Sequence, residues 1–552
     1  MPPARRRAHP KDRRGIGGHR GPGPGTARPA RSPGTARPAR SPGSVLGIPG
    51  APLVLTLALW LLALVPRVQS NPALVWSFHA AVAALLAWQA VLFVRLRRGT
   101  TPRSLETVFR PQHYVQAAVQ LSVFAYWGWY WRPVYDHAWL LVAQLLFAYA
   151  FDMLLAWSRR ERYALGFGPF PIIFSTNLFL WFRDDWFALQ FLMIAVGFLG
   201  KELVRWERGG RRVHIFNPSA FSLGLFSVVL IATDTTALTW GEDIATTLTL
   251  APRIYLFLFL AGLVVMYRFA ITLVAGSAAI VLFGLSALYA AATGVPYFID
   301  SEIPTAVFLG LHLLVTDPST STRTPLGKTV FGVLYGVGVF ALYALLGAFG
   351  APTFYDKLLS VPLLNLSVRW IDRLAGAVEA RALLRPVTRR LARPGANLAQ
   401  MAVWVVFFGT MTALGATDGR HRGDTVPFWE QACAESRPQA CQRLLQIEAS
   451  YCADASAWAC NELGRHHTDG AIVAADSALG LDYFARACEL RFRPACLNLL
   501  ARDAEYRAPP KTLDLRLLLR EGGRNLMEMS EADLRTRACE HGWSFACGEA
   551  SR

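Results

Sequence analysis

Two polar segments that contain proline interrupt the apolar background of this sequence, and their residue types are the ones best suited to chemistry. Residues 200–225 include Asn-Pro-Ser at positions 217–219, and residues 312–332 include Asp-Pro-Ser at positions 317–319. Proline removes a backbone donor and pushes the residue before it out of helical geometry, so each segment should interrupt a helix. The freed N–H groups and the neighbouring hydroxyls could hold a phosphate or a ring carbonyl.

Both segments also allow a purely structural interpretation, which spacing alone favours. Asn217 or Ser219 could cap the helix that follows the first proline, and Thr324 could cap the helix that begins at Pro325. Polar residues elsewhere in the apolar segments carry the same ambiguity, because each is costly in a membrane unless it is paired or functional. These residues are Gln144, Asp152, Asn177, Glu302 and His312.

Apolar helices must position these segments. The 552 residues are 53% hydrophobic and 17% charged, whereas soluble globular proteins carry about 25% charged residues. The apolar residues arrive in blocks of roughly 18 to 25, the length that crosses a hydrocarbon core about 30 Å thick. The composition excludes an ordinary cytosolic enzyme and predicts a polytopic membrane protein. The number of apolar segments predicts an all-α helix bundle of about 10–12 spans. The absence of a nucleophile–base pattern also argues against a hydrolase.

Basic clusters set the expected orientation. Residues 95–103, 159–162 and 201–212 follow the second, fourth and sixth apolar segments, which are centred near residues 84, 146 and 193. The positive-inside rule therefore places these basic clusters and the amino terminus in the cytoplasm. The expected domains are a disordered basic tail at 1–48, a transmembrane bundle at 49–350, an interfacial or amphipathic connector at 351–397, a last transmembrane helix at 398–416 and periplasmic helical repeats at 425–552.

The basic tail contains a tandem copy of TARPARSPG and almost no apolar residues, so it cannot bury enough surface to fold. Its expected partner is anionic membrane lipid. Nucleic acid is not expected, because no aromatic residue is interleaved with the arginines.

All eight cysteines lie after residue 430, in four pairs whose members are eight positions apart. Two short helices joined by a tight turn would bring such positions within reach of a disulfide, and an even count at fixed spacing is typical of an oxidising compartment. Metal binding is the alternative, but no Cys-x-x-Cys occurs. The expected disulfides join Cys433 to Cys441, Cys452 to Cys460, Cys488 to Cys496 and Cys539 to Cys547.

This cysteine-rich region resembles the Sel-like branch of the tetratricopeptide family, as in YFARACELRFRPACLNLL at 483–500. The resemblance implies an α–α solenoid that binds another protein on its concave face.

The two proline-bearing segments, taken together, resemble the RnfD/NqrB family, the membrane component shared by the Rnf electron-transport complex and the sodium-translocating NADH:quinone oxidoreductase. The matching positions are Gly200, Lys201, Glu202, Arg211, Phe216, Asn217, Pro218 and Ala220 in the first segment, and Thr316, Asp317, Pro318, Ser319, Ser321, Thr324, Gly327, Lys328 and Gly332 in the second. The resemblance covers roughly residues 140–350. It implies two related halves, a flavin on the membrane component, and electron transfer coupled to Na⁺ or H⁺ movement.

The resemblance further implies FMN or riboflavin as the cofactor. The expected cofactor-binding residues are Asn217, Pro218, Ser219, Thr246, Thr316, Asp317, Ser319, Ser321, Thr324 and Lys328. Family members that attach FMN covalently use a threonine in a Ser-Gly-Ala-Thr-like sequence, whereas this chain has only Ala245-Thr246-Thr247 and lacks the Ser-Gly. Covalent attachment is therefore in doubt.

The leading prediction is a multi-pass component of an ion-translocating electron-transport complex in the bacterial inner membrane, without a complete active site of its own. Its expected partners are the other proteins of that complex, a protein that binds the repeats, and membrane lipid. Two alternatives remain open: a flavin-free transporter or channel, and a membrane-anchored scaffold that acts through its repeats.

Overall fold

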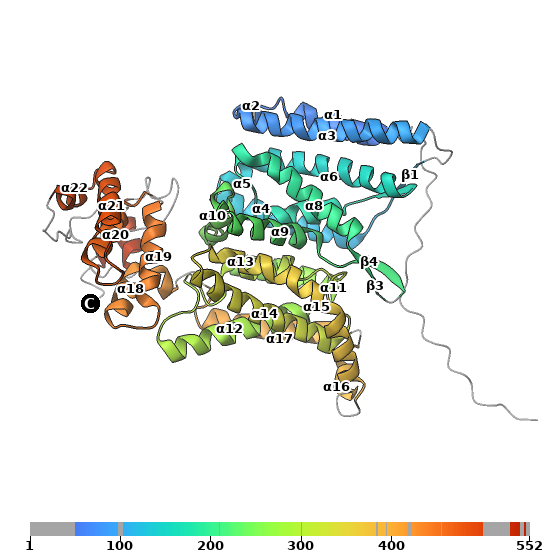
Figure 1. Ribbon diagram of the computed structural model, residues 1–552. Helices are drawn as coiled ribbons and strands as arrows, with labels where there is room; N and C mark the ends of the chain where they lie inside the picture. Colours follow the sequence, from blue (N-terminus) through green and yellow to red (C-terminus); the bar gives the residue numbers. More distant parts are fainter. Residues whose placement is uncertain are drawn as a thin grey trace, which may run out of the picture. The chain divides into compact units, whose positions relative to one another are not determined.

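The computed structural model describes residues 50–97, 103–208, 210–299, 301–381, 385–393, 395–417, 421–453, 455–500, 530–540 and 546–547. The basic tail expected at 1–48 lies outside these ranges. Helices dominate the described residues, as expected (Figure 1). Short strands form two separate pairs. β1 (Ser104–Thr107) runs parallel to β2 (Arg162–Leu165), and β3 (Arg205–Arg208) runs antiparallel to β4 (Arg211–His214).

The apolar region forms a helix bundle around one continuous hydrophobic core. Its helices are α1 (Gly50–Leu62), α2 (Pro66–Gln69), α3 (Pro72–Arg97), α4 (Pro111–Tyr130), α5 (Pro133–Asp136), α6 (Ala138–Arg159), α7 (Pro169–Asn177), α8 (Phe187–Leu203), α9 (Pro218–Ala232), α10 (Gly241–Thr247), α11 (Ile254–Phe269), α12 (Thr272–Thr293), α13 (Thr305–Leu313), α14 (Pro325–Ala348), α15 (Asp356–Glu379), α16 (Arg385–Leu391) and α17 (Ala396–Ala413).

Several of these helices have the length and composition of membrane spans. Among the described residues, six are long and apolar enough to cross a membrane, and a seventh is counted if α10 and α11, bent by 102° at their junction, act as one span. The membrane character expected from composition is thus confirmed, and the expected number of 10–12 spans stays a prediction.

Two nine-residue helices, α7 and α13, lie deep in the bundle. All nine residues of α13 and seven of the nine in α7 are buried. A nine-residue helix is about 13 Å long, which is less than half of a hydrocarbon core of about 30 Å. Each is therefore too short to cross a membrane by itself, and the chain continues beyond it without helical structure.

The connector region expected at 351–397 contains a long helix that packs along the bundle. α15 lies against α14 and α9, and the backbone N–H of Leu326 donates to Glu379 Oε1 over 2.8 Å, so α14 and α15 run antiparallel. Gly224 allows the close approach of α9, because an added Cβ there would lie 2.7 Å from Pro362 Cγ in α15. The short α16 that follows carries Arg385, Arg389 and Arg390.

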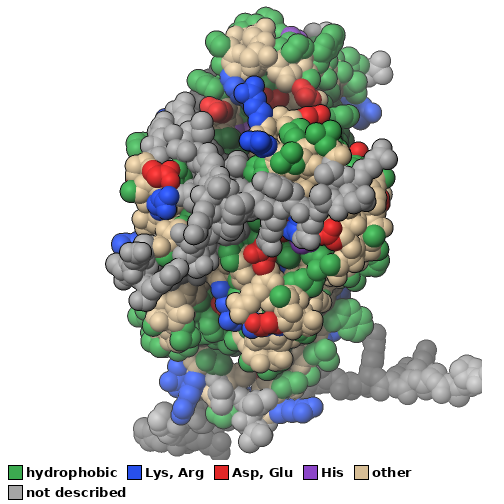
Figure 2. Space-filling model, turned by 90° about the vertical axis from the view of Figure 1, so that its left-hand side faces the viewer, with side chains coloured by type: hydrophobic (Ala, Val, Ile, Leu, Met, Phe, Trp, Pro, Cys, Tyr) green, Lys and Arg blue, Asp and Glu red, His purple; other side chains and the backbone are tan. Residues whose placement is uncertain are grey.

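The C-terminal region forms a helical module with its own apolar core, which includes Trp429, Trp458 and Phe484. Its helices are α18 (Val426–Ala434), α19 (Ala440–Ala453), α20 (Ala457–Asp469), α21 (Ser477–Glu489), α22 (Arg493–Leu500) and α24 (Glu531–Glu540). Acidic and basic side chains both appear on the face shown in Figure 2.

All four expected disulfides are present. They are Cys433–Cys441, Cys452–Cys460, Cys488–Cys496 and Cys539–Cys547, with Cα atoms 4.6 to 4.8 Å apart. Each closes a short loop within one part of the module, as the eight-residue spacing predicts. The solenoid itself stays a prediction.

Candidate functional site

A cavity of about 840 Å³ opens at the end of the bundle that carries the strand pairs. Its wall contains the first residues of three helices, and each of these helices begins at a proline: Pro111 in α4, Pro169 in α7 and Pro218 in α9. Proline suits a first helical turn because it has no N–H to satisfy. Since helix N-termini carry partial positive charge, their convergence favours an anionic ligand in this cavity.

Asn217 joins the two proline-bearing segments. Its side-chain oxygen accepts hydrogen bonds from the backbone N–H and the hydroxyl of Ser219, at 3.1 and 2.8 Å, and so caps α9. Its side-chain NH₂ donates to the backbone oxygen of Leu314 over 3.1 Å. The backbone N–H of Asn217 in turn donates to Asn365 Oδ1. The residue is therefore both the helix cap that the structural interpretation expected and the link to the second segment.

Asp317 organises the second segment in a similar way. Its carboxylate accepts hydrogen bonds from the backbone N–H and the hydroxyl of Ser319 at 2.9 and 2.7 Å, and from the hydroxyl of Thr320 at 3.2 Å. His214 Nε2 lies 2.9 Å from the Ser319 hydroxyl and 3.9 Å from the carboxylate. Burial opposes ionisation, but His214 and Ser319 outweigh it and lower the pKa of Asp317. An ionised Asp317 thus holds its loop in one conformation.

The structure brings one part of the expected site together. Five of the ten expected cofactor-binding residues line the cavity: Asn217, Pro218, Ser219, Asp317 and Ser319. They come from segments about one hundred positions apart in the sequence and share one space.

Four other expected residues do not line this cavity. The Thr316 hydroxyl donates to the backbone oxygen of His312, and Thr324 caps α14 by accepting from the N–H of Gly327. Lys328 Nζ donates to the backbone oxygen of Ala270. The buried Ser321 hydroxyl has no hydrogen-bond partner among the described residues. The contacts of Thr316, Thr324 and Lys328 hold the backbone, so their positions indicate structural roles.

Thr246 also lies outside the cavity. It is in α10, which follows α9, whereas the cavity is at the start of α9. The fifteen residues of α9 span about 22 Å. The Thr246 hydroxyl donates to the backbone oxygen of Glu242 within its own helix. The structure therefore does not group Thr246 with the other expected cofactor-binding residues.

The cavity contains more basic than acidic side chains. Its wall includes Arg110, Arg160, Arg162, Lys201, Arg205 and Arg268 with Glu106, Asp152, Glu202 and Asp317. Some of these charges are paired: Glu202 contacts Arg160 at 2.6 Å and Arg205 at 2.8 Å, and Lys201 lies 3.7 Å from Asp152. Arg110 and Arg268 form no ion pair with any described carboxylate. They are therefore the cations best placed to meet an added anion.

No family model, curated protein or solved structure matches this chain. Within the described ranges, no three His, Cys, Asp or Glu side chains are grouped so that they could hold a metal ion. The size and charge of the cavity fit a phosphate-bearing organic ligand, since such sites occupy about 300–1,000 Å³.

The polar residues of the apolar segments have different surroundings. Gln144 and Asn177 form a buried hydrogen-bonded network with His137 and Gln190, with 2.7 Å between Asn177 Nδ2 and Gln144 Oε1. The Gln190 side chain also accepts from the N–H of Phe182, beyond the end of α7. This network stabilises the non-helical segment after α7, because it satisfies a backbone donor that a helix would otherwise use.

Asp152 does not pair with the basic cluster at 159–162. It instead accepts from the Tyr163 hydroxyl at 3.2 Å and lies 3.7 Å from Lys201, while Arg159 and Arg160 contact Glu202. The helical periodicity of α6 could not reveal this arrangement, because both partners of Asp152 lie outside that helix.

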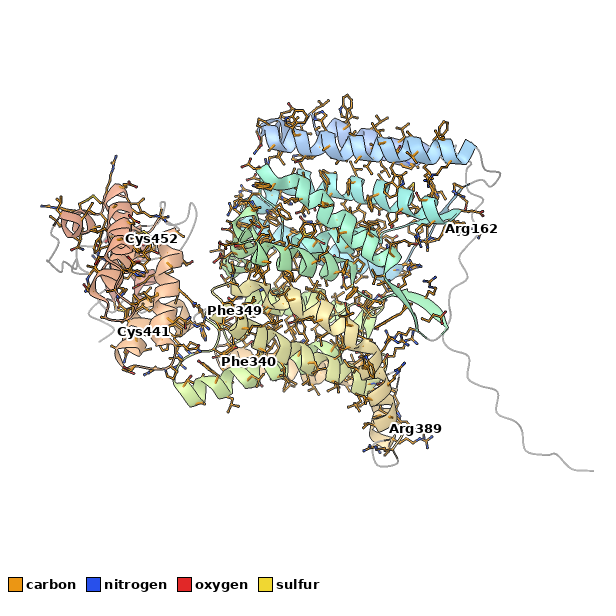
Figure 3. The ribbon with its side chains drawn as sticks, in the orientation of Figure 1. Arg162, Phe340, Phe349, Arg389, Cys441 and Cys452 are labelled. Atoms are coloured by element: carbon orange, nitrogen blue, oxygen red, sulfur yellow. A yellow bond between two sulfur atoms is a disulfide. The ribbon has the colours of Figure 1, made fainter. Side chains whose placement is uncertain are left out.

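Sequence reasoning missed several residues of the cavity wall. Arg110, His113, Tyr163, His214 and Arg268 all line it. The signal that α4, α7 and α9 share is a proline at the helix start, but α2, α3, α5 and α14 also begin at proline, so this signal alone could not identify the wall. Arg162 also belongs to the cavity wall. In Figure 3 it lies toward one end of the bundle, and Phe349 lies toward the other end.

Proposed function

We propose that this chain is the membrane component of an ion-translocating electron-transport complex of the RnfD/NqrB type. The cavity would contact its flavin or quinone. One observation carries the proposal: the two segments that resemble this family line a single cavity and are joined by the hydrogen bond from Asn217 to Leu314.

The basic wall of the cavity suits FMN better than riboflavin, because FMN carries a phosphate and riboflavin does not. Arg110 and Arg268 would bind the phosphate as charged donors, and the first turn of α9 would add the favourable end of its dipole. Asp317 and His214 would fix the loop that forms one wall. A bound flavin would supply the electron chemistry, while the protein contributes binding and orientation.

The membrane arrangement in this proposal is a bundle of about 10–12 crossings in two related halves. The short buried helices α7 and α13 would then be equivalent broken segments of the two halves. The basic end, with the cavity, would face the bacterial cytoplasm, and the disulfide module would lie in the periplasm. There its repeats would bind a protein partner, while other proteins of the complex and lipid would contact the bundle.

A flavin titration of the purified full-length chain tests the proposal. We expect FMN to bind more tightly than riboflavin, with a change in the flavin absorbance spectrum. Arg268→Gln should weaken FMN binding roughly tenfold, because it removes a charge-assisted contact, and should leave riboflavin binding unchanged. Arg535→Gln, an exposed change in the module, is the matched control. Failure of FMN to bind, or equal loss in Arg535→Gln, would contradict the proposal.

A flavin-free transporter or channel is the second candidate, and two observations favour it. The Ser-Gly of the attachment sequence is missing, and Thr246 lies outside the cavity. In that case the same cationic wall would bind a small anion. A preparation that is colourless, does not bind FMN, and binds inorganic phosphate with a loss in Arg268→Gln would select this candidate.

A membrane-anchored scaffold that acts through its repeats is the third candidate. It would be selected if deleting residues 425–552 abolished function while substitution of Asn217 and Asp317 had no effect.

A further inference from the structure

The loop between α12 and α13 (residues 294–299 and 301–304, called the α12–α13 loop) contacts the C-terminal module. Val295 of this loop is 1% exposed and belongs to the apolar core of the module, together with Val426, Trp429 and Ala440. A bundle residue thus completes the core of the repeats. An independent, freely tethered module would not need such a residue.

Two arginines of the module hold the backbone of the same loop. Arg437 Nη1 donates to the backbone oxygen of Gly294 over 2.9 Å, and Arg443 Nη2 donates to that of Tyr297 over 3.4 Å. The guanidinium of Arg443 also lies 5.1 Å from the centre of the Tyr343 ring in α14. Arg443 is only 9% exposed, although arginine is almost never buried without partners. One of its partners, Gln446, lies in its own helix, and the others, Tyr297 and Tyr343, belong to the bundle, so the burial of Arg443 depends in part on its contact with the bundle.

Residues 421–423, which lie just before α18 of the module, also contact the α12–α13 loop. His421 Nδ1 lies 3.2 Å from the backbone oxygen of Ile299, and His421 Nε2 lies 3.6 Å from Glu302. Glu302 in turn accepts from the hydroxyl of Ser286 in α12. Gly423 is required for the close approach, because an added Cβ would lie 2.2 Å from the oxygen of Ile299.

The α12–α13 loop leads directly into the cavity wall through one short helix. α13 begins at Thr305, is buried along its whole length, and ends at Leu313. The next residue, Leu314, accepts the hydrogen bond of Asn217, and Asp317 lines the cavity. A packed helix of about 13 Å cannot compress, so a shift of the loop at its start must be absorbed by packing or appear at its end.

We propose that the C-terminal module is a clamp on the α12–α13 loop, which fixes the position of α13 and thereby the cavity edge from Leu314 to Ser319. The surface that contains Arg437 and Arg443 is then already occupied by this chain. A protein that binds that surface must displace the loop, and so it changes the cavity at the far end of α13. The physical basis is a continuous set of packed contacts rather than proximity alone.

Hydrogen exchange of the full-length protein in lipid nanodiscs tests the clamp without any cavity ligand. Arg443→Ala should raise exchange roughly tenfold in the α12–α13 loop and also at residues 314–321. There the N–H groups of Val315, Ser319 and Ser321 are hydrogen-bonded and serve as reporters. Arg486→Ala is the matched control, because Arg486 is an exposed arginine of the module that donates to Ala453 within it.

A second variant keeps the test decisive if Arg443→Ala does not fold. Arg443→Lys retains the charge but lacks the planar fork of donors, so it should give the same pattern with a smaller increase. Faster exchange in the loop without any change at 314–321 would overturn the coupling to the cavity. Unchanged exchange at both places, or the same change in Arg486→Ala, would overturn the clamp itself. None of these outcomes depends on flavin binding.

Discussion

The side chain of Asn217 and the backbone oxygen of Leu314 are joined by a hydrogen bond of 3.1 Å, which connects the start of α9 to the chain just after α13. The same asparagine caps α9 through its side-chain oxygen. Asn217 therefore accepts hydrogen bonds from backbone N–H groups at the start of α9, and it also fixes the relative position of two segments that line the cavity.

Substitution of Asn217 should separate these two roles. Asn217→Ala removes the cap and the bond to Leu314, so we expect the free energy of unfolding to fall by about 2 kcal/mol. Asn217→Ser retains a good cap but cannot reach Leu314, and it should lose about half as much. Denaturant unfolding of the full chain in detergent measures both. An Asn217→Ser variant as stable as the parent would contradict a contribution from the Leu314 bond.

Thr246 should carry no covalent flavin. Its hydroxyl donates within α10, and the residue does not line the cavity. We therefore expect the intact mass of the purified chain to equal that of the polypeptide with its disulfides, and Thr246→Val to leave FMN binding unchanged. A flavin-sized mass increment that disappears in Thr246→Val would show this prediction to be wrong.

Removal of one disulfide should weaken the module locally. The double variant Cys488→Ser with Cys496→Ser opens a loop of roughly eight residues, which corresponds to a loss of about 2–3 kcal/mol by the chain-entropy model. We expect faster proteolysis in α21 and α22, while the other disulfides remain intact by peptide mapping. Glu489→Ser, an exposed change between the two cysteines, is the control. Equal protease sensitivity of control and double variant would refute the prediction.

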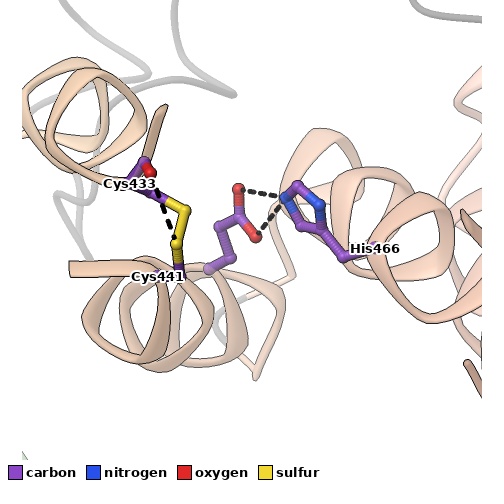
Figure 4. The surroundings of a disulfide bond; sticks show 4 residues. Cys433, Cys441 and His466 are labelled. Carbon is purple, nitrogen blue, oxygen red and sulfur yellow. Dashed lines mark hydrogen bonds and ion pairs between the residues drawn. A yellow bond between two sulfur atoms is a disulfide. The ribbon is translucent and has the colours of Figure 1, made fainter. Parts of the chain in front are cut away.

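The module should lose stability as the pH rises through about 7. Glu448 in α19 and His466 in α20 form a partly buried pair with 3.2 Å between Nε2 and Oε2 (Figure 4). Burial raises the pKa of Glu448 to about 7. Burial alone would lower the pKa of His466, but the hydrogen bond and charge of Glu448 outweigh it and raise that pKa.

The raised pKa values of Glu448 and His466 change the stability of the module with pH in the same direction. Because each folded pKa exceeds its unfolded value, the folded module binds protons more tightly, and this contribution is full at low pH and lost as pH rises through the folded pKa values. Glu448→Gln removes one of these groups and should flatten the profile. Scanning calorimetry of the full chain between about pH 5.5 and pH 8.5 measures this. A parent module that gains stability over that range would contradict the assignment.

Local spacing made part of the structure predictable. The eight-residue interval of the cysteines fixed all four disulfides, because two short helices and a turn bring such positions together whatever surrounds them. The caps at Asn217 and Thr324 were predictable for the same reason, since a proline follows each directly. Apolar length likewise indicated membrane helices, although it could not count them.

Long-range contacts were not predictable in the same way. Arg268 lines the cavity only because α11 ends beside segments that lie distant in the sequence. The pairing of Asp152 with Lys201 depends on how α6 and α8 pack, and the burial of Arg443 depends on Tyr343, one hundred positions away. No periodicity in a single helix contains that information.

The spacing of the disulfides in the module affects how the number of its repeats can change in evolution. Every bridge joins cysteines only eight positions apart, and none ties one bridged unit to another. A unit could thus be duplicated or deleted together with its own disulfide, and every cysteine in the remaining units would keep its disulfide partner. During oxidative folding each cysteine meets its correct partner, eight positions away, more often than a cysteine of another unit. Correct pairing is therefore faster than mispairing between units.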